Sequence, residues 1–276
     1  RCGVASMTGR SKRTALVTGA SEGIGFAIAA ALAHTGHRVV LAARRPDGLE
    51  AALRRLIAAG VDADNLLSVE IDIGNTSSID AALATVAPWA PGLDILVNNA
   101  GLVIGPKPFG AETEAAVRRG LEVNLFGALQ LIERLLPGMR KNSYGRIVNI
   151  ASTAGMHGPP TLIPYAVSKG ALIAFSRTLA VELAGAGITV NAISPGPVAT
   201  ANYRASKGEE AIANRARSIP DNRLAHPDDV GALAAFLCSE EAGHLTGQNI
   251  ALDGGEDAAG PYVGMVIQQR PHTGHA

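Results

Sequence analysis

Three side chains that can take part in proton transfer stand at a regular spacing in the second half of the chain. Tyr165 and Lys169 are four residues apart, so on a helix they share one face, and Ser152 precedes Tyr165 by thirteen residues. A free phenol has a pKa of ~10, and bringing it to ~7 takes about 4 kcal/mol of phenolate stabilisation, which a neighbouring ammonium can supply. Ser152 can donate a hydrogen bond to an oxygen on which charge develops. These residues predict a site where a phenol gives a proton to a bound oxygen.

A glycine-rich segment near the start of the chain predicts a phosphate cradle. Residues 18–25 read TGASEGIG and directly follow the apolar run 15–17. Glycine permits a tight turn and a close approach of pyrophosphate, while the free N–H groups of a helix start point at the phosphates. The spacing G-x-x-x-G-x-G is looser than the G-x-G-x-x-G fingerprint, so its weight depends on the other motifs.

The elements that must position these residues follow from alternating apolar patterns. Short apolar runs predict strands at 15–18, 38–42, 66–71, 93–98, 145–151, 188–193 and 249–252. Helical periods lie between them at 24–35, 48–59, 77–87, 113–139, 165–184 and 228–237. This alternation predicts an α/β fold, a doubly wound Rossmann-type parallel sheet of about seven strands with helices on both faces. Ligands of such sheets bind beyond the carboxyl ends of the strands.

The chain carries no internal linker rich in Pro, Gly and Ser, which favours one domain. We predict a single dinucleotide-binding catalytic domain at 12–255, a flexible N-terminal tail at 1–11 and a C-terminal tail at 256–276. The polar, interrupted segment 197–223 is expected to be either a lid over substrate or a passive surface loop.

Composition excludes several classes of function. The sequence is 47% hydrophobic and 17% charged, its formal net charge is zero and its aromatic content is 4%. It can therefore bury a large core, and neither a nucleic-acid partner nor a base-stacking surface is expected. No apolar run approaches the ~18 residues of a membrane span, so a cytoplasmic protein without membrane contact is expected. Cys2 and Cys238 make no disulfide framework, and His272 and His275 lack a third ligand for a metal.

Further motifs stand where the expected strands end. Asn98-Asn99-Ala100-Gly101 follows the fourth strand, Ser152 the fifth and Pro195-Gly196 the sixth. Taken with the glycine-rich segment, these motifs make residues 13–255 resemble the short-chain dehydrogenase/reductase family. The resemblance is to its compact single-domain branch, and within it to the polyketide and fatty-acyl ketoreductases. Enoyl reductases of the family space Tyr and Lys more widely, so that pattern does not fit.

The resemblance implies roles for many residues. The catalytic residues would be Asn124, Ser152, Tyr165 and Lys169, with Asn124 holding a water that links Lys169 to solvent. The cofactor-binding residues would be Thr18, Gly19, Ser21, Glu22, Gly23, Ile24, Gly25, Arg44, Arg45, Asp72, Ile73, Asn98, Ala100, Gly101, Tyr165, Lys169, Pro195, Gly196, Val198 and Thr200. The substrate residues would be Ser152, Thr153, His157, Leu162, Tyr165 and Pro197. Asn124 can instead bridge two backbone segments, and Asp72 can instead cap a helix or turn its loop.

The residues after the second strand bear on the choice of nicotinamide cofactor. An NAD-specific site places an acidic side chain there for the ribose 2′-hydroxyl, but this chain has Ala43, Arg44 and Arg45. Guanidinium groups bind a 2′-phosphate well, which favours NADP(H) over NAD(H). Glu22 in the glycine-rich segment conflicts with this, because its carboxylate either repels the phosphate or pairs with Arg44.

The sequence therefore predicts an NADP(H)-dependent oxidoreductase that interconverts a carbonyl and a secondary alcohol, a ketoreductase for a mainly apolar small-molecule substrate. The resemblance implies a homotetramer or dimer built through the fourth and fifth helices. Two alternatives remain: an NAD-dependent alcohol dehydrogenase, and a non-catalytic dinucleotide-binding sensor. The Ser152, Tyr165 and Lys169 set argues against the sensor, which needs no proton donor.

Overall fold

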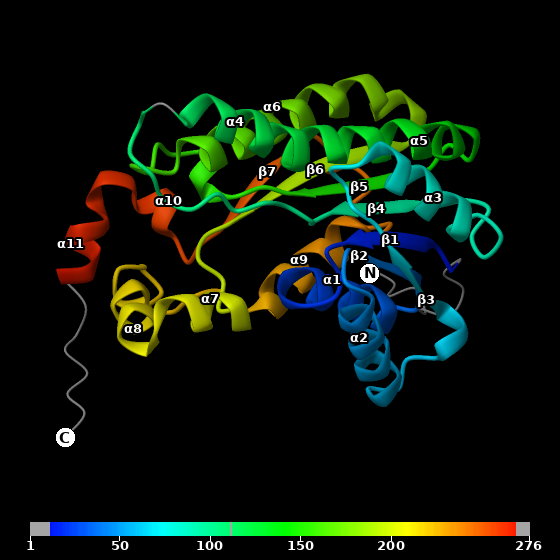
Figure 1. Cartoon of the computed structure of the whole chain (residues 1–276), viewed down its shortest axis with the longest axis horizontal. Coiled ribbons are helices and arrows are strands. Elements are labelled where there is room, and N and C mark those ends of the chain that lie inside the picture. Colours follow the sequence, from blue (N-terminus) through cyan, green and yellow to red (C-terminus); the bar gives the residue numbers. More distant parts are fainter. Residues whose placement is uncertain (1–11, 111, 269–276) are drawn as a thin grey trace, which may run out of the picture.

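A parallel sheet forms the centre of the protein. The structure, a computed structural model, describes residues 12–110 and 112–268. Within them seven strands pair in the order β3-β2-β1-β4-β5-β6-β7 (Figure 1). The strands are β1 (Thr14–Thr18), β2 (Arg38–Ala43), β3 (Leu66–Glu70), β4 (Ile95–Asn98), β5 (Gly145–Ile150), β6 (Ile188–Pro195) and β7 (Asn249–Leu252). The strand order reverses between β1 and β4, which is where such sheets bind ligands. The predicted doubly wound fold is confirmed.

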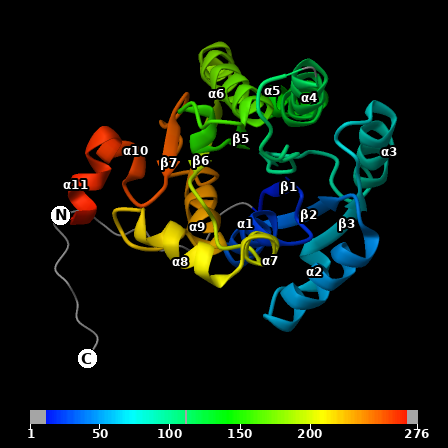
Figure 2. The same cartoon turned by 60° about the vertical axis from the view of Figure 1, so that its left-hand side comes forward.

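Helices connect the strands and cover both faces of the sheet. They are α1 (Gly23–His34), α2 (Pro46–Ala58), α3 (Thr76–Val86), α4 (Thr113–Leu121), α5 (Gly127–Lys141), α6 (Ile163–Leu183), α7 (Ala201–Lys207), α8 (Glu209–Arg217), α9 (Pro227–Leu237), α10 (Glu256–Ala259) and α11 (Val263–Gln268). Figures 1 and 2 show α1, α2 and α9 on one face and α3 to α6 on the other.

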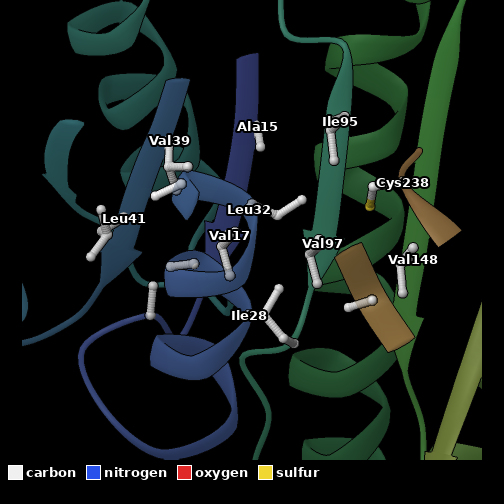
Figure 3. Packing of buried hydrophobic residues seen from close by; sticks show 14 of the residues in the cluster. Ala15, Val17, Ile28, Leu32, Val39, Leu41, Ile95, Val97, Val148 and Cys238 are labelled. Carbon is white, nitrogen blue, oxygen red and sulfur yellow. The ribbon is translucent and has the colours of Figure 1, made fainter. Parts of the chain in front are cut away.

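The core divides along the alternation of the strands. Val17 on β1 packs with Ile28 and Leu32 of α1 on one face, as Figure 3 shows. Its neighbour Leu16 points to the other face, where it packs with Leu131 of α5. Each such buried side chain contributes about 1.5–3 kcal/mol through removal from water. Because both faces are covered, β1 is buried at every position, which explains its continuous apolar run.

Two expected elements differ in the structure. The helix expected at 113–139 is interrupted by a π-helical turn, η2 (Glu122–Phe126), between α4 and α5. Such a turn inserts a residue into the helix and re-aims the side chains it carries, which periodicity in sequence does not reveal. The helix expected from 165 begins at Ile163, with a proline in its first turn.

The two segments outside the regular alternation contain short helices. Residues 197–223 include α7 and α8, separated by Gly208. The hydroxyl of Thr200 accepts a hydrogen bond from the N–H of Tyr203 and caps α7. Residues 256–268 form α10, the 3₁₀ turn η5 (Gly260–Tyr262) and α11. The predicted tail at 1–11, and His272 and His275, lie outside the described residues.

No helix in the described part of the chain has both the length and the apolar character required to span a bilayer.

Candidate active site

The glycine-rich segment forms a tight turn between β1 and α1. Gly19 and Gly23 have φ angles of +66° and +57°. A Cβ atom on Gly25 would lie 2.1 Å from the carbonyl oxygen of Gly19, so only glycine fits there. Glu22 precedes α1 without a capping hydrogen bond from its side chain, which leaves the first-turn N–H groups of α1 open to an anion. This cradle fits the pyrophosphate of a dinucleotide.

Thr18 and Asn99 hold the start of this segment against the loop after β4. The hydroxyl of Thr18 accepts hydrogen bonds from the N–H groups of Asn99 and Ala100, both at 3.0 Å. The side-chain amide of Asn99 donates to the carbonyl of Thr18 at 2.9 Å. Sequence reasoning assigned no role to Asn99, although its place in the Asn98–Gly101 motif was the available signal. Asn98 is buried instead and donates to the side chain of Asn149 at 2.9 Å.

The three predicted proton-transfer residues come together at the carboxyl end of the sheet. Ser152 follows Ala151 at the end of β5, and its hydroxyl lies close enough to Tyr165 on α6 to lower the pKa of the phenol. Lys169, one turn further along α6, places its Nζ 5.9 Å from the ring centroid of Tyr165. The hydroxyl of Ser152 also accepts a hydrogen bond from the N–H of Ala154 at 3.1 Å. The structure thus assembles the group that the spacing predicted.

Burial sets the protonation of both Tyr165 and Lys169. Burial raises the pKa of Tyr165, and its hydrogen bond with Ser152 opposes that rise. Burial lowers the pKa of Lys169 to about 8. Nζ of Lys169 donates to the carbonyl of Ile150 at 2.7 Å, and Lys169 is 5% exposed. The expectation that Lys169 lowers the pKa of Tyr165 is therefore not met by the chain alone, since desolvation is the larger effect.

Asn124 lies in the π-helical turn and is 2% exposed. Its side-chain oxygen accepts from the N–H of Leu102 at 2.6 Å, and its amide donates to the carbonyl of Leu102 at 3.0 Å and to the hydroxyl of Ser168 at 2.9 Å. It therefore joins the loop after β4 to the side chain of Ser168 on α6, and its catalytic role stays a prediction. A Cβ atom on Gly101 would lie 3.1 Å from the side-chain oxygen of Asn124 and 3.4 Å from Nζ of Lys169. Gly101, Asn124 and Lys169 are therefore neighbours. Ser168 had no predicted role, although it is only one residue before Lys169.

Glu22 forms an ion pair with Arg45, and the expectation that its partner would be Arg44 is wrong. Nη2 of Arg45 lies 2.9 Å from Oε1 of Glu22. The same oxygen accepts a hydrogen bond from the side-chain amide of Asn202 on α7, also at 2.9 Å. One carboxylate thus joins the glycine-rich segment to the end of β2 and to the start of α7.

The remaining predicted cofactor residues lie around this edge of the sheet. Asp72 accepts a hydrogen bond from the N–H of Gly74 at 3.0 Å and turns its loop, while Ile73 is buried in the core. Ser21 lies next to Gly48, where a Cβ atom would come within 3.1 Å of the Cβ of Ser21. The N–H of Gly196 donates to the carbonyl of Leu252 at 3.0 Å.

The loops after β5 and β6 meet beside the three proton-transfer residues. The hydroxyl of Thr153 lies 3.4 Å from the carbonyl of Pro195, to which it donates. Val198 is 7% exposed, and the methyl group of Thr200 would lie 3.2 Å from a Cβ on Gly23. His157 pairs through Nε2 with the carboxylate of Asp257 at 3.1 Å. The roles of these five predicted residues stay predictions.

A cavity of about 230 Å³ lies between the loop before α4, α4 itself and the start of α6. It is mostly apolar, and its described lining includes Ile104, Pro108, Ala116, Ile163 and Pro164. None of the six predicted substrate residues is part of this described lining, although Tyr165 directly follows Pro164. Among the described residues, no three His, Cys, Asp or Glu side chains group as a metal site.

Comparisons with known proteins show which proteins the chain is similar to. A family model described as "Enoyl-(Acyl carrier protein) reductase" matches residues 19–256. The 3-oxoacyl-[acyl-carrier-protein] reductase FabG of Vibrio cholerae is 35% identical over 243 residues, which cover 88% of this chain and 96% of that protein.

Two solved structures are similar to this chain, and each holds a different nicotinamide cofactor. A crystal structure of an actinorhodin polyketide ketoreductase with NADPH has a TM-score of 0.79 and 35% identity, covering 88% of this chain and 97% of the other. A 3-ketoacyl-(acyl-carrier-protein) reductase from Brucella melitensis complexed with NADH has a TM-score of 0.80 and 33% identity, with the same two coverages.

Proposed function

The chain belongs to the short-chain dehydrogenase/reductase family, and from this premise we propose that it is an NADP(H)-dependent ketoreductase for a mainly apolar carbonyl substrate. The observation that carries the proposal is the convergence of Ser152, Tyr165 and Lys169, with Nζ of the buried Lys169 5.9 Å from the ring centroid of Tyr165. A sensor would need no such proton donor. The spacing of Tyr165 and Lys169, which differs from that of enoyl reductases, favours reduction of a carbonyl over reduction of an enoyl double bond.

Tyr165 is the proton donor in this proposal. The bound nicotinamide supplies a hydride to the carbonyl carbon. Tyr165 gives its proton to the carbonyl oxygen, and Ser152 donates a hydrogen bond to that oxygen as negative charge develops on it. The ammonium of Lys169 then stabilises the phenolate, because a charge one helical turn away is weakly screened in a buried site. Its pKa of about 8 keeps it mostly protonated at neutral pH.

Asn124 acts as a positioning residue. Its side chain fixes the backbone of Leu102 beside Lys169, which keeps the ammonium oriented between α6 and the loop after β4. We also retain the water between Lys169 and solvent that the family resemblance implies, held by Asn124, as the path by which Tyr165 regains its proton.

The cradle formed by Gly19, Gly23 and Gly25 would hold the pyrophosphate, and Lys169 and Tyr165 would hold the nicotinamide ribose. NADP(H) is favoured because Arg44 and Arg45 follow β2, where an NAD site places an acidic residue. Glu22 limits this preference, since its carboxylate already neutralises Arg45. The two solved relatives hold NADPH and NADH respectively, so relatives alone leave the choice open.

A homotetramer or dimer is part of the proposal. Apolar side chains are exposed on the helices expected to form the interface: Val167 and Val181 of α6 are 44% and 80% exposed, and Phe126 beside α5 is 45% exposed. A second copy that covers them would remove this apolar surface from water.

A single screen tests the function and the cofactor together. NADPH and NADH oxidation are measured over aliphatic, aromatic, steroid and β-ketoacyl carbonyls, with the parent chain and E22Q. We expect turnover on at least one apolar ketone or ketoacyl compound, with kcat/KM higher for NADPH. E22Q should raise the ratio of kcat/KM for NADPH to kcat/KM for NADH about fivefold, because one negative charge is removed near the 2′-phosphate.

E50Q is the matched control, since Glu50 also pairs with an arginine, Arg54, at 3.0 Å on exposed α2. It should leave the ratio unchanged. A parent that turns over no carbonyl contradicts the function, and a lower kcat/KM for NADPH than for NADH contradicts the cofactor choice.

A further inference from the structure

Residues 253–257, here called the Asp253 turn, follow β7 at the carboxyl end of the sheet. Asp253 is 8% exposed. Its carboxylate accepts hydrogen bonds from the N–H groups of Gly255 at 3.0 Å and Asp257 at 2.8 Å. The carbonyl of Gly254 accepts from the N–H of Asp221 at 3.2 Å. The turn is therefore fixed both internally and to the segment that precedes α9.

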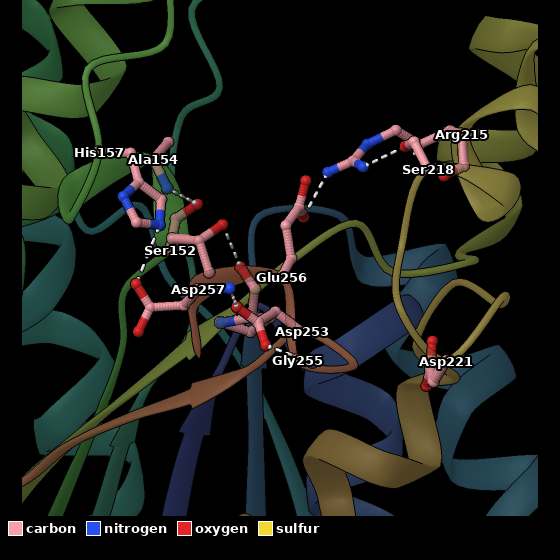
Figure 4. Close-up of polar contacts among 12 residues, drawn as sticks. Ser152, Ala154, His157, Arg215, Ser218, Asp221, Asp253, Gly255, Glu256 and Asp257 are labelled. Carbon is pink, nitrogen blue, oxygen red and sulfur yellow. Dashed lines mark hydrogen bonds and ion pairs between the residues drawn. The ribbon is translucent and has the colours of Figure 1, made fainter. Parts of the chain in front are cut away.

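Two neighbouring side chains extend from this turn in opposite directions, as Figure 4 shows. The carboxylate of Asp257 lies 3.1 Å from Nε2 of His157. The carboxylate of Glu256 lies 2.6 Å from Nη2 of Arg215 on α8. Both contacts join charged or chargeable groups, so each has a preferred geometry as well as an attraction.

The two partners belong to different segments, which the proposed function makes two walls of the substrate site. His157 lies five residues after Ser152, in the turn that also holds Thr153, and its own N–H donates to the carbonyl of Thr153 at 3.0 Å. Arg215 belongs to the segment 201–217, which contains α7 and α8 and starts beside the glycine-rich segment at Asn202. Figures 1 and 2 place α10 between α6 and α8.

We propose that Glu256 and Asp257 are positioning residues that hold these two walls at a set separation, and so determine which carbonyl substrates fit. The inference rests on the proposed function, because it assigns the walls to a substrate site. Glu256 acts on the α7–α8 segment and Asp257 on the Ser152 turn. Neither residue touches the reacting atoms, so their loss should affect substrate binding more than the chemical step.

If Glu256 and Asp257 had a purely structural role, their loss would lower the stability of the fold instead of raising KM. The side chains of these pairs are between 29% and 50% exposed. Ion pairs with this exposure contribute little to global stability, so their removal should leave the fold intact. Unfolding therefore cannot explain the expected change in KM. An unchanged kcat and an unchanged affinity for NADPH would show that each variant is still folded.

The test uses the full chain with E256Q, D257N, R215E, the double variant E256Q/D257N and the charge-swapped pair R215E/E256R. The best ketone from the screen serves as substrate, and thermolysin cleavage within 201–217 reports the position of the α7–α8 segment without turnover. E50Q is again the matched control.

We expect KM to rise about threefold to tenfold in each single variant and further in the double, with kcat and the Kd of NADPH within twofold of the parent. Cleavage within 201–217 should accelerate about fivefold in E256Q and R215E, and the swapped pair should restore both values because it re-forms the attraction.

The proposal is overturned if the double variant keeps the KM and the cleavage rate of the parent, or if R215E/E256R behaves like R215E alone. A parent without turnover would contradict the proposed function, while the cleavage rates would still decide whether Glu256 holds α8.

Discussion

A tyrosine and a buried cation stand at each end of β5. At its amino end, Tyr144 and Arg146 are 8% and 4% exposed. At its carboxyl end, the carbonyl of Ile150 accepts the hydrogen bond from Lys169, one turn after Tyr165. Burial raises the pKa of both tyrosines. The two pairs thus share composition and a buried cation, but their cations have different surroundings.

Arg146 is surrounded by partners. Its guanidinium donates to the carbonyls of Ser239, Gly145 and Gly187 at 3.2, 3.0 and 3.4 Å. Its Cζ also lies 4.3 Å from the ring centroid of Tyr144. A planar group with five donors and a permanent charge suits such a multiply bonded position. This end of the strand holds structure together.

Within the described residues, Nζ of Lys169 donates to a single protein acceptor, the carbonyl of Ile150. An ammonium has three donors, so its charge is incompletely compensated, and burial lowers its pKa to about 8. The comparison teaches that burial of a cation indicates a chemical role only where partners are few and the group can titrate.

The largest expected effect separates the two tyrosines. Y165F removes the proposed proton donor and should lower kcat by about 10²–10⁴, while NADPH binding persists. Y144F, the matched variant at the other end, should change kcat by less than about twofold, since Tyr144 lies away from the site. Steady-state kinetics and NADPH fluorescence titration measure both. A Y165F protein that keeps a tenth of the parent turnover would remove Tyr165 from the mechanism.

The next effect separates the two cations. R146M should lose about 3 kcal/mol of unfolding free energy, because three carbonyls lose their donor, while turnover per folded molecule is kept. K169M should lose about 10²-fold in turnover. K169M should also gain up to about 3 kcal/mol of unfolding free energy at neutral pH, because the lowered pKa reflects the cost of burying the charge of Lys169. The loss of the hydrogen bond to Ile150 reduces this gain. Urea unfolding checks both; the reverse pattern would contradict the comparison.

The smallest effect is a pH dependence at Lys169. Its pKa falls from 10.5 in a free side chain to about 8 in the folded chain, so between these values the unfolded state binds more protons. The contribution of Lys169 to the unfolding free energy should therefore rise with pH above about 8, by about 1 kcal/mol per pH unit. Turnover should fall over the same interval as the ammonium is lost. The difference between parent and K169M in urea unfolding, measured up to about pH 9.5, isolates this slope, and a flat difference would contradict it.

Much of the fold and the core of the site could be predicted because they depend on local patterns. The strand order was not predicted, yet the exits of the strands at Asn98 and Ser152 were, and parallel strands bring their carboxyl ends to one edge. The four-residue spacing of Tyr165 and Lys169 was sufficient to place them on one helix face. The π-helical turn around Asn124 was missed, because an inserted residue leaves no mark on apolar periodicity.

The sequence by itself determined the alternation of strand and helix, the glycine-rich turn and the choice of residues proposed for proton transfer, since each follows from residue type and short spacing. Tertiary structure decided the partners and the energies. It selected Arg45 over Arg44 for Glu22, brought Asp257 to His157 across 100 residues of chain, and lowered the pKa of Lys169 through burial. These outcomes depend on which distant groups packing brings together and how much water it removes.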